Sequence, residues 1–116
     1  MSFHKSSTGL STGTLGAMSE MVAIADLMKR GYHVFRAQSP SCPCDLVIFK
    51  DNQVCLRVEV RTINGERGTY SNGKIANMHY KDNGIIDIWA FVWVNGKVEY
   101  HGPPKVGIDS NNDYPI

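Results

Sequence analysis

The sequence lacks the features of a membrane or disulfide-rich protein. No stretch approaches the ~18 apolar residues that indicate a membrane span. Residues 1–13 contain no apolar segment of the kind that a secretion signal requires. The cysteines are three, Cys42, Cys44 and Cys55, and an odd number fits a reducing compartment better than a disulfide framework. We therefore expect a cytoplasmic protein that has no membrane partner.

The chain also has little excess charge, since 12 Lys and Arg residues face 11 Asp and Glu residues for a net charge of +1. This balance neither requires nor excludes a nucleic-acid partner, and any basic surface has to be local. Hydrophobic residues make up 42% and charged residues 20% of the chain, which is typical of a globular protein. Its 116 residues suit one domain with a modest core.

The order of the helix and strand signals predicts a single α/β (α+β) domain over residues 14–102. Residues 1–13 are rich in Ser, Thr and Gly and predict a flexible arm, and residues 103–116 predict an irregular tail. A helix is expected over 15–30, with Thr12 or Thr14 as its cap and Gly31 at its end. Strands are expected over residues 32–37, 45–50, 54–62, 85–94 and 97–100. Residues 63–74 indicate a loop or a loose hairpin, and 75–84 fit a helical turn or a loop. A mixed sheet with a helix packed on it follows from this order.

The expected helix carries one acidic residue at the edge of its apolar arc. At about 100° per residue, Asp26 and Arg30 lie opposite this arc, and Glu20 lies at its border. A carboxylate at a core boundary needs a cation, a metal or a hydrogen-bond donor. Glu20 therefore either pairs with a nearby arginine or forms a third acidic group of a metal site. The arc itself consists of Met18, Met21, Val22, Ile24, Ala25 and Met28.

In the segment LRVEVRT, residues 56–62, strand alternation places successive side chains on opposite faces of the sheet. Leu56, Val58 and Val60 share an apolar face, whereas Glu59 lies on the other face with Cys55, Arg57 and Arg61. A short turn at 51–53 joins this strand to 45–50 as an antiparallel pair, which brings Asp45 and Glu59 together. Two converging carboxylates suit a hard divalent cation such as Mg²⁺. The alternative is that Asp45 caps a turn and Glu59 pairs with Arg57.

Three segments, GAMSEMVAIADLMKRGYHVF, PCDLVIF and LRVEVRT, together resemble the PD-(D/E)XK nuclease superfamily. The closest style is that of archaeal-type Holliday junction resolvases and group I intron-associated endonucleases. The match covers residues 16–62, about half of the chain. The resemblance implies a restriction-endonuclease-like mixed β-sheet flanked by helices. It also implies a homodimer on DNA, possibly branched DNA, and phosphodiester hydrolysis with Mg or Mn as cofactor.

The resemblance also implies roles for individual residues. Asp45 and Glu59 would be the metal ligands, with the carbonyl of Val60 as a possible third, and Glu20 would be the helix carboxylate. Pro43 is offset from the family's Pro-Asp pair by Cys44. Arg61 stands where the family has a catalytic lysine. Arginine holds a phosphate well but does not easily act as a base, so a DNA-binding module with weak or no catalysis is the alternative function.

Further residues are expected to contact DNA. The resemblance suggests Ser39 or Ser41, in the loop before Asp45, for a phosphate. Lys81 either replaces the missing lysine, contacts DNA or belongs to a solvated loop. For Trp89, Phe91 and Trp93 core packing is favoured over a dimer face, and a zinc site at the cysteines is disfavoured. Arg57, Arg67 and Lys74, together with Tyr70, are expected to form a basic lip for the phosphate backbone. Thr62 completes the set of expected DNA contacts.

Overall fold

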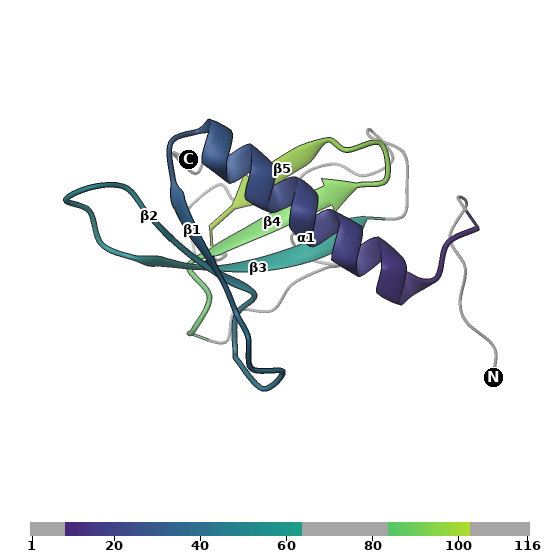
Figure 1. The fold of residues 1–116 in the computed structure, drawn as a ribbon, viewed down its shortest axis with the longest axis horizontal. Coiled ribbons are helices and arrows are strands. Elements are labelled where there is room, and N and C mark those ends of the chain that lie inside the picture. The colour runs from purple at the N-terminus through teal and green to yellow at the C-terminus, as the bar shows by residue number, and fades with distance from the viewer. Residues whose placement is uncertain (1–8, 64–83, 103–116) are drawn as a thin grey trace, which may run out of the picture.

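The computed structural model describes residues 9–63 and 84–102 and shows one helix over a five-stranded sheet in these ranges (Figure 1). This arrangement confirms the predicted fold class, a single mixed α+β domain. In chain order the elements are α1 (Thr12–Lys29), β1 (His33–Arg36), β2 (Leu46–Phe49), β3 (Leu56–Ile63), β4 (Ile88–Trp93) and β5 (Val98–His101). Among the described residues, no helix is long and apolar enough to cross a membrane.

Helix α1 begins earlier than the sequence predicts. Its N-cap is Ser11, whose hydroxyl oxygen accepts a hydrogen bond from the Thr14 backbone N–H at 3.2 Å. The expectation that Thr12 or Thr14 caps the helix is therefore wrong, and the first two helical residues, Thr12 and Gly13, lie inside the segment expected to be a flexible arm. At the other end, Gly31 has φ +93°, a left-handed conformation that glycine adopts easily, as expected for this position.

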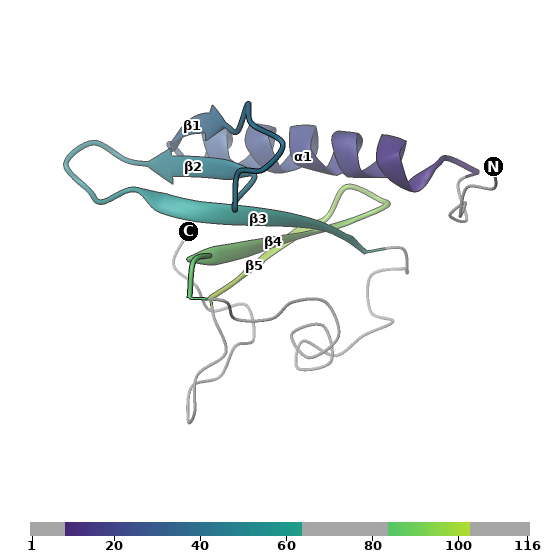
Figure 2. The same cartoon turned by 90° about the horizontal axis from the view of Figure 1, so that it is seen from below.

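The strands lie in chain order across the sheet, from β1 to β5 (Figure 2). Neighbours are antiparallel except for β3 and β4, which run parallel with Val58 opposite Ile88. The predicted antiparallel pair of β2 and β3 is confirmed, with Leu46 opposite Val58. The connection from β3 to β4 contains residues 64–83, which lie outside the described residues, as do residues 1–8 and 103–116.

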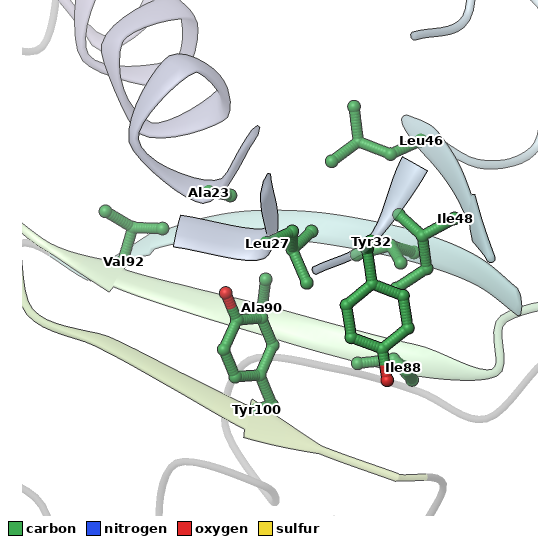
Figure 3. Close-up of a cluster of buried hydrophobic side chains, with 10 residues drawn as sticks. Ala23, Leu27, Tyr32, Leu46, Ile48, Ile88, Ala90, Val92 and Tyr100 are labelled. Carbon is green, nitrogen blue, oxygen red and sulfur yellow. The ribbon is translucent and has the colours of Figure 1, made fainter. Parts of the chain in front are cut away.

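One hydrophobic core lies between α1 and the sheet (Figure 3). Leu27 and Ala23 of the helix meet side chains that alternate along the strands and so all point to one face of the sheet. Both helix residues have no exposed surface, and full burial of a leucine contributes roughly 1.5–3 kcal/mol. The strand and loop residues of this core are Tyr32, Leu46, Ile48, Val58, Ile88, Ala90, Val92 and Tyr100.

The helix is rotated relative to the expected apolar arc: Val22 and Ile24 of that arc pack against the core as predicted, but the prediction is wrong for its methionines and Ala25, which are exposed. Asp26, expected on the outer side, accepts a hydrogen bond from the Tyr100 hydroxyl at 2.5 Å. Ser19 and Ala23 allow close approach to the sheet because they are small, while α1 has more apolar residues than one sheet face can cover. The exposed fractions of Met18, Met21 and Met28 are 44%, 61% and 61%. The buried residues of the helix are instead Leu15, Ser19, Ala23 and Leu27, spaced four apart.

The sheet face opposite α1, hereafter the far face, has a second core. Trp89, Phe91 and Trp93 of β4 are buried there and pack with Cys44, Ile63 and Ile86. The favoured interpretation of these aromatic residues as core is therefore confirmed. Alternation along β2 and β3 places Asp45 and Glu59 on this same far face, away from the helix.

Candidate active site

The two carboxylates that the sequence pairs do come together in the structure. The register of β2 and β3 ends with Leu46 opposite Val58, and Asp45 and Glu59 are the next residues along the two strands. The backbone N–H of Asp45 donates to the Val58 carbonyl at 3.0 Å and ties Asp45 to β3. A hydrogen bond between the carboxyl groups of Asp45 and Glu59 brings both acid groups to one spot on the far face.

Asp45 is fixed by the backbone of the neighbouring strand. Its carboxylate accepts a hydrogen bond from the Val60 N–H at 2.8 Å, in a partly buried position. Asp45 precedes β2, which begins at Leu46, and its carboxylate oxygen satisfies this backbone N–H of β3. This contact orients the acid group toward β3. The predicted role of the Val60 carbonyl as a ligand stays a prediction, because the contact involves its N–H.

Glu59 is held in a setting that opposes its negative charge. Partial burial raises the pKa of Glu59 above its ordinary value, and the charge of Asp45 together with a hydrogen bond between the two carboxyl groups raises it further. The guanidinium of Arg61 acts in the opposite direction and lowers this pKa. Two carboxyl groups that resist joint ionisation form a site at which a bound cation relieves the repulsion.

Arg61 lies beside the acid pair, two residues after Glu59 on the same side of β3. Its Nη2 atom is 3.0 Å from Oε2 of Glu59, and half of its side chain is exposed. The guanidinium is therefore the more solvent-exposed partner of this ion pair, since only 20% of the Glu59 side chain is exposed.

Arg57, which the sequence predicts to contact DNA, binds Asp87, a partner that the sequence did not indicate. Asp87 accepts from the backbone N–H of Arg57 at 2.7 Å and from its Nε and Nη2 at 3.1 and 3.3 Å. Although burial opposes it, these hydrogen bonds leave the pKa of Asp87 below its ordinary value. The sequence contains little sign of the contact between Asp87 and Arg57, because this contact depends on the parallel register of β3 and β4.

Glu20 does not join the acid pair. Its Oε1 atom is 2.6 Å from Nε of Arg36 on β1, so the alternative of a salt bridge to a nearby arginine describes its contact. Within 9–63 and 84–102, no three His, Cys, Asp or Glu side chains come together closely enough to hold a metal ion. The predicted convergence of three carboxylates is therefore wrong in its geometry, and the structure brings together two of them.

Thr62 also faces away from the acid pair. Its hydroxyl oxygen is 2.7 Å from that of Ser19, a buried residue of α1, so the two form a hydrogen bond between strand and helix. Alternation along β3 places Thr62 on the helix side, whereas Glu59 and Arg61 lie on the far face. The structure thus places this residue in the helix–sheet contact.

The loop before Asp45 contains the two serines expected to contact phosphate. Both are exposed, and the hydroxyl oxygens of Ser39 and Ser41 are 3.0 Å apart.

All three cysteines are free thiols, and burial raises the pKa of Cys44 to about 11, with a further contribution from Cys42. The remaining predicted DNA contacts, Arg67, Lys74 and Lys81, lie outside the described residues.

The acid pair has the donor chemistry that a hard cation requires. Mg²⁺ usually binds through one or two carboxylates and keeps several waters, so a third protein carboxylate is not needed. The half-exposed guanidinium of Arg61 next to the pair is also of the chemical type that binds phosphate oxygens. The residues present therefore fit a divalent cation at Asp45 and Glu59.

Comparisons with known proteins place the chain by fold. No protein-family model matches it, and no curated protein matches its sequence. Among solved structures it is similar to a bacterial homing endonuclease, I-Ssp6803I, with a TM-score of 0.57 and 15% sequence identity. The likeness covers 79% of this chain and 65% of that one, so it spans less than two thirds of the neighbour's length. The chain thus shares its fold with a structurally characterised homing endonuclease.

Proposed function

We propose that the protein is a Mg²⁺- or Mn²⁺-dependent DNA endonuclease of the PD-(D/E)XK type, acting on branched DNA like a junction resolvase or on a homing-type site. The observation that carries this proposal is the juxtaposition of Asp45 and Glu59 on the far face, with Arg61 beside them. The nuclease-like fold supports it.

In this proposal each residue of the site has its own task. Asp45 and Glu59 hold the cation, which when bound supplies positive charge for the phosphate and makes an attacking water more acidic. The Val60 N–H keeps the Asp45 carboxylate aimed at the site through its 2.8 Å hydrogen bond. Arg61 binds an oxygen of the scissile phosphate and stabilises the charge that develops on it.

The experiment compares nicking of branched and linear DNA by the wild type and by Asp45→Asn and Glu59→Gln, with Mg²⁺ or Mn²⁺. We expect the wild type to cut at least one of these substrates and both variants to lose about a hundredfold or more of the rate. Asp51→Asn is the matched control, because the Asp51 side chain is 85% exposed and contacts His33 instead. Equal cleavage by all four proteins would contradict the proposal.

A second candidate function, a DNA-binding module without catalysis, has its own supporting observation. Arg61 forms a 3.0 Å ion pair with Glu59, where the resembled family has a lysine. Since arginine stays protonated, it binds a phosphate but does not take up a proton. The variant Arg61→Lys separates the two functions, because a gain of nicking from an inactive wild type identifies the binding module. DNA binding that is unchanged by EDTA supports the module as well.

A further inference from the structure

An aromatic side chain lies exposed on the far face, beside the candidate active site. Phe35 of β1, the first strand of the sheet (Figure 2), is 60% exposed. Its neighbour Val34 packs against the core under α1, so strand alternation turns Phe35 to the far face. Phe35 lies opposite Val47, which packs with the second core on this same face. It therefore presents an apolar ring to solvent on the face that carries the acid pair.

The ring of Phe35 is supported by a second aromatic ring. Phe49 of β2 stacks on it, with ring centroids 5.8 Å apart and an interplanar angle of 10°. The ring of His33 packs on Phe49 with centroids 5.0 Å apart, and its Nε2 atom is 2.8 Å from Oδ1 of Asp51. Offset, nearly parallel rings are a favourable arrangement that restricts the orientation of both. The stack thus holds Phe35 in place while most of its side chain stays exposed.

The exposed ring lies close to one residue of the acid pair. The Asp45 carbonyl accepts a hydrogen bond from the backbone N–H of Ala37 at 2.9 Å, so the ladder between β1 and β2 extends to Asp45. Phe35 and Asp45 are therefore diagonal neighbours on the far face. Such neighbours lie roughly 7–8 Å apart, which is within reach of an aromatic side chain. A molecule bound at the acid pair can thus extend onto the ring.

Two guanidinium groups lie on the far face near this ring. Arg57 lies opposite Val47 on the side away from Phe35, so a ring, an aliphatic side chain and a guanidinium form one row across three strands. The side chains of Arg57 and Arg61 are 47% and 50% exposed. Each pairs with one carboxylate, but a guanidinium has five N–H donors and can bind a phosphate as well. Cationic donors next to an aromatic ring are the combination that binds single-stranded nucleic acid.

We propose that Phe35 is a base-stacking residue and that the far face over β1 and β2 binds a single-stranded segment of DNA. One unpaired base stacks on the exposed ring, and a neighbouring phosphate reaches the acid pair and Arg61. This proposal rests on the proposed function, because it assigns the occupant of the surface beside that site. It adds a preference for substrates that carry an unpaired nucleotide next to the scissile phosphate.

The chemistry of the ring favours an unpaired base over an intact duplex. Proteins contact the phosphates and sugars of a duplex through cationic side chains and hydrogen-bond donors, and phenylalanine is neither. The faces of a base inside a duplex are covered by its neighbours, so only a displaced or unpaired base can stack on a side chain. Phe35 therefore distinguishes single-stranded from duplex DNA, whereas the arginines bind both.

The first test measures DNA binding by fluorescence anisotropy, at low salt with EDTA. The probes are a dye-labelled strand of about 12 thymidines and a duplex of the same length. Phe35→Leu removes the ring but keeps an apolar side chain, and it should weaken binding of the single strand about five- to hundredfold. Phe35→Tyr keeps the ring and should bind like the wild type. Met21→Leu is the matched control, because Met21 is 61% exposed but lies on α1, and its binding should not change.

The duplex separates stacking from general affinity for DNA. Phe35→Leu should change duplex binding by less than about twofold, since the ring makes no phosphate contact. Unchanged binding of the single strand by Phe35→Leu overturns the proposal, and so does an equal loss on both probes or a wild type that binds no single strand. No metal is present in these measurements, so metal-dependent nicking and Mn²⁺ binding judge the proposed function separately.

A second test uses a strand of the same length that keeps the sugars and phosphates but has no bases. The wild type should bind this abasic strand about five- to hundredfold more weakly than the thymidine strand, because stacking is lost. Phe35→Leu should lose most of this preference, which makes the two changes non-additive. Equal binding of both strands by the wild type overturns the proposal whether or not the variant folds. A full preference for thymidines in a Phe35→Leu variant with the circular dichroism of the wild type overturns it as well.

Discussion

The carboxylate of Asp45 accepts a hydrogen bond from the backbone N–H of Val60 at 2.8 Å. This contact ties the residue before β2 to the middle of β3, and it holds one acid group of the candidate site beside the other. Asp45 therefore has two separable roles, a structural one through its oxygen atom and an electrostatic one through its charge. Substitutions can remove one role and keep the other.

Replacing Asp45 by alanine should destabilise the fold more than replacing it by asparagine. The asparagine oxygen can still accept from the Val60 N–H, whereas alanine leaves this partly buried donor without its acceptor. We expect a difference of about 1 kcal/mol in the free energy of unfolding, measured by urea denaturation with EDTA present. Equal stability of the two variants would show that the hydrogen bond contributes nothing.

Glu59→Gln should become more stabilising, relative to the wild type, as the pH rises. The folded state raises the pKa of Glu59 above its ordinary value of 4.5 and so binds its proton more tightly than the unfolded chain. The wild type therefore loses stability as the pH rises from 4.5 through the folded pKa, while glutamine has no proton to lose. Thermal unfolding between about pH 4 and pH 8 without metal measures this difference, and a gap that does not widen contradicts the account.

Tyr100→Phe should lower stability without affecting the acid pair. The Tyr100 hydroxyl donates to the Asp26 carboxylate at 2.5 Å and connects β5 to α1. Because the acceptor is a charged group, the loss is expected to be about 1.5–3 kcal/mol in the free energy of unfolding. In an Asp26→Asn background the same change should cost less, and a double-mutant cycle gives the coupling. Additive effects would show that the two groups do not interact.

Leu27→Ala tests the orientation of α1. Leu27 is completely buried against the sheet, so its truncation should cost about 2–5 kcal/mol in the free energy of unfolding. Val54→Ala removes apolar atoms from a residue that is 79% exposed and should be nearly neutral. Chemical denaturation of both variants measures the difference. If the helix instead buried the apolar arc expected from the sequence, which contains the methionines, Leu27→Ala would have little effect on stability.

The sheet could be predicted from the sequence further than the helix could. Strand alternation and the turn at 51–53 were sufficient to pair β2 with β3 and to bring Asp45 to Glu59. The rotation of α1 could not be predicted, because the helix has apolar residues on two sides. The contact of Asp87 with Arg57 depends on the parallel pairing of β3 and β4, whose register a single sequence does not reveal.

Glu20 shows the same limit at the candidate site. Its position at the edge of the helix was compatible with either an arginine or a metal site, and the choice depended on how α1 lies on the sheet. The structure sets it 2.6 Å from Arg36. The acid pair was predictable because neighbouring strands fix both residues, whereas the third carboxylate required the packing of a separate element.

The most direct measurement of the central claim, that Asp45 and Glu59 form a divalent cation site, is the binding of Mn²⁺ followed by electron paramagnetic resonance. We predict that the wild type binds Mn²⁺, that Mg²⁺ competes for it, and that Asp45→Asn and Glu59→Gln each abolish the binding. The control Asp51→Asn should bind like the wild type. Undiminished Mn²⁺ binding by both site variants, or no binding by the wild type, would contradict the claim.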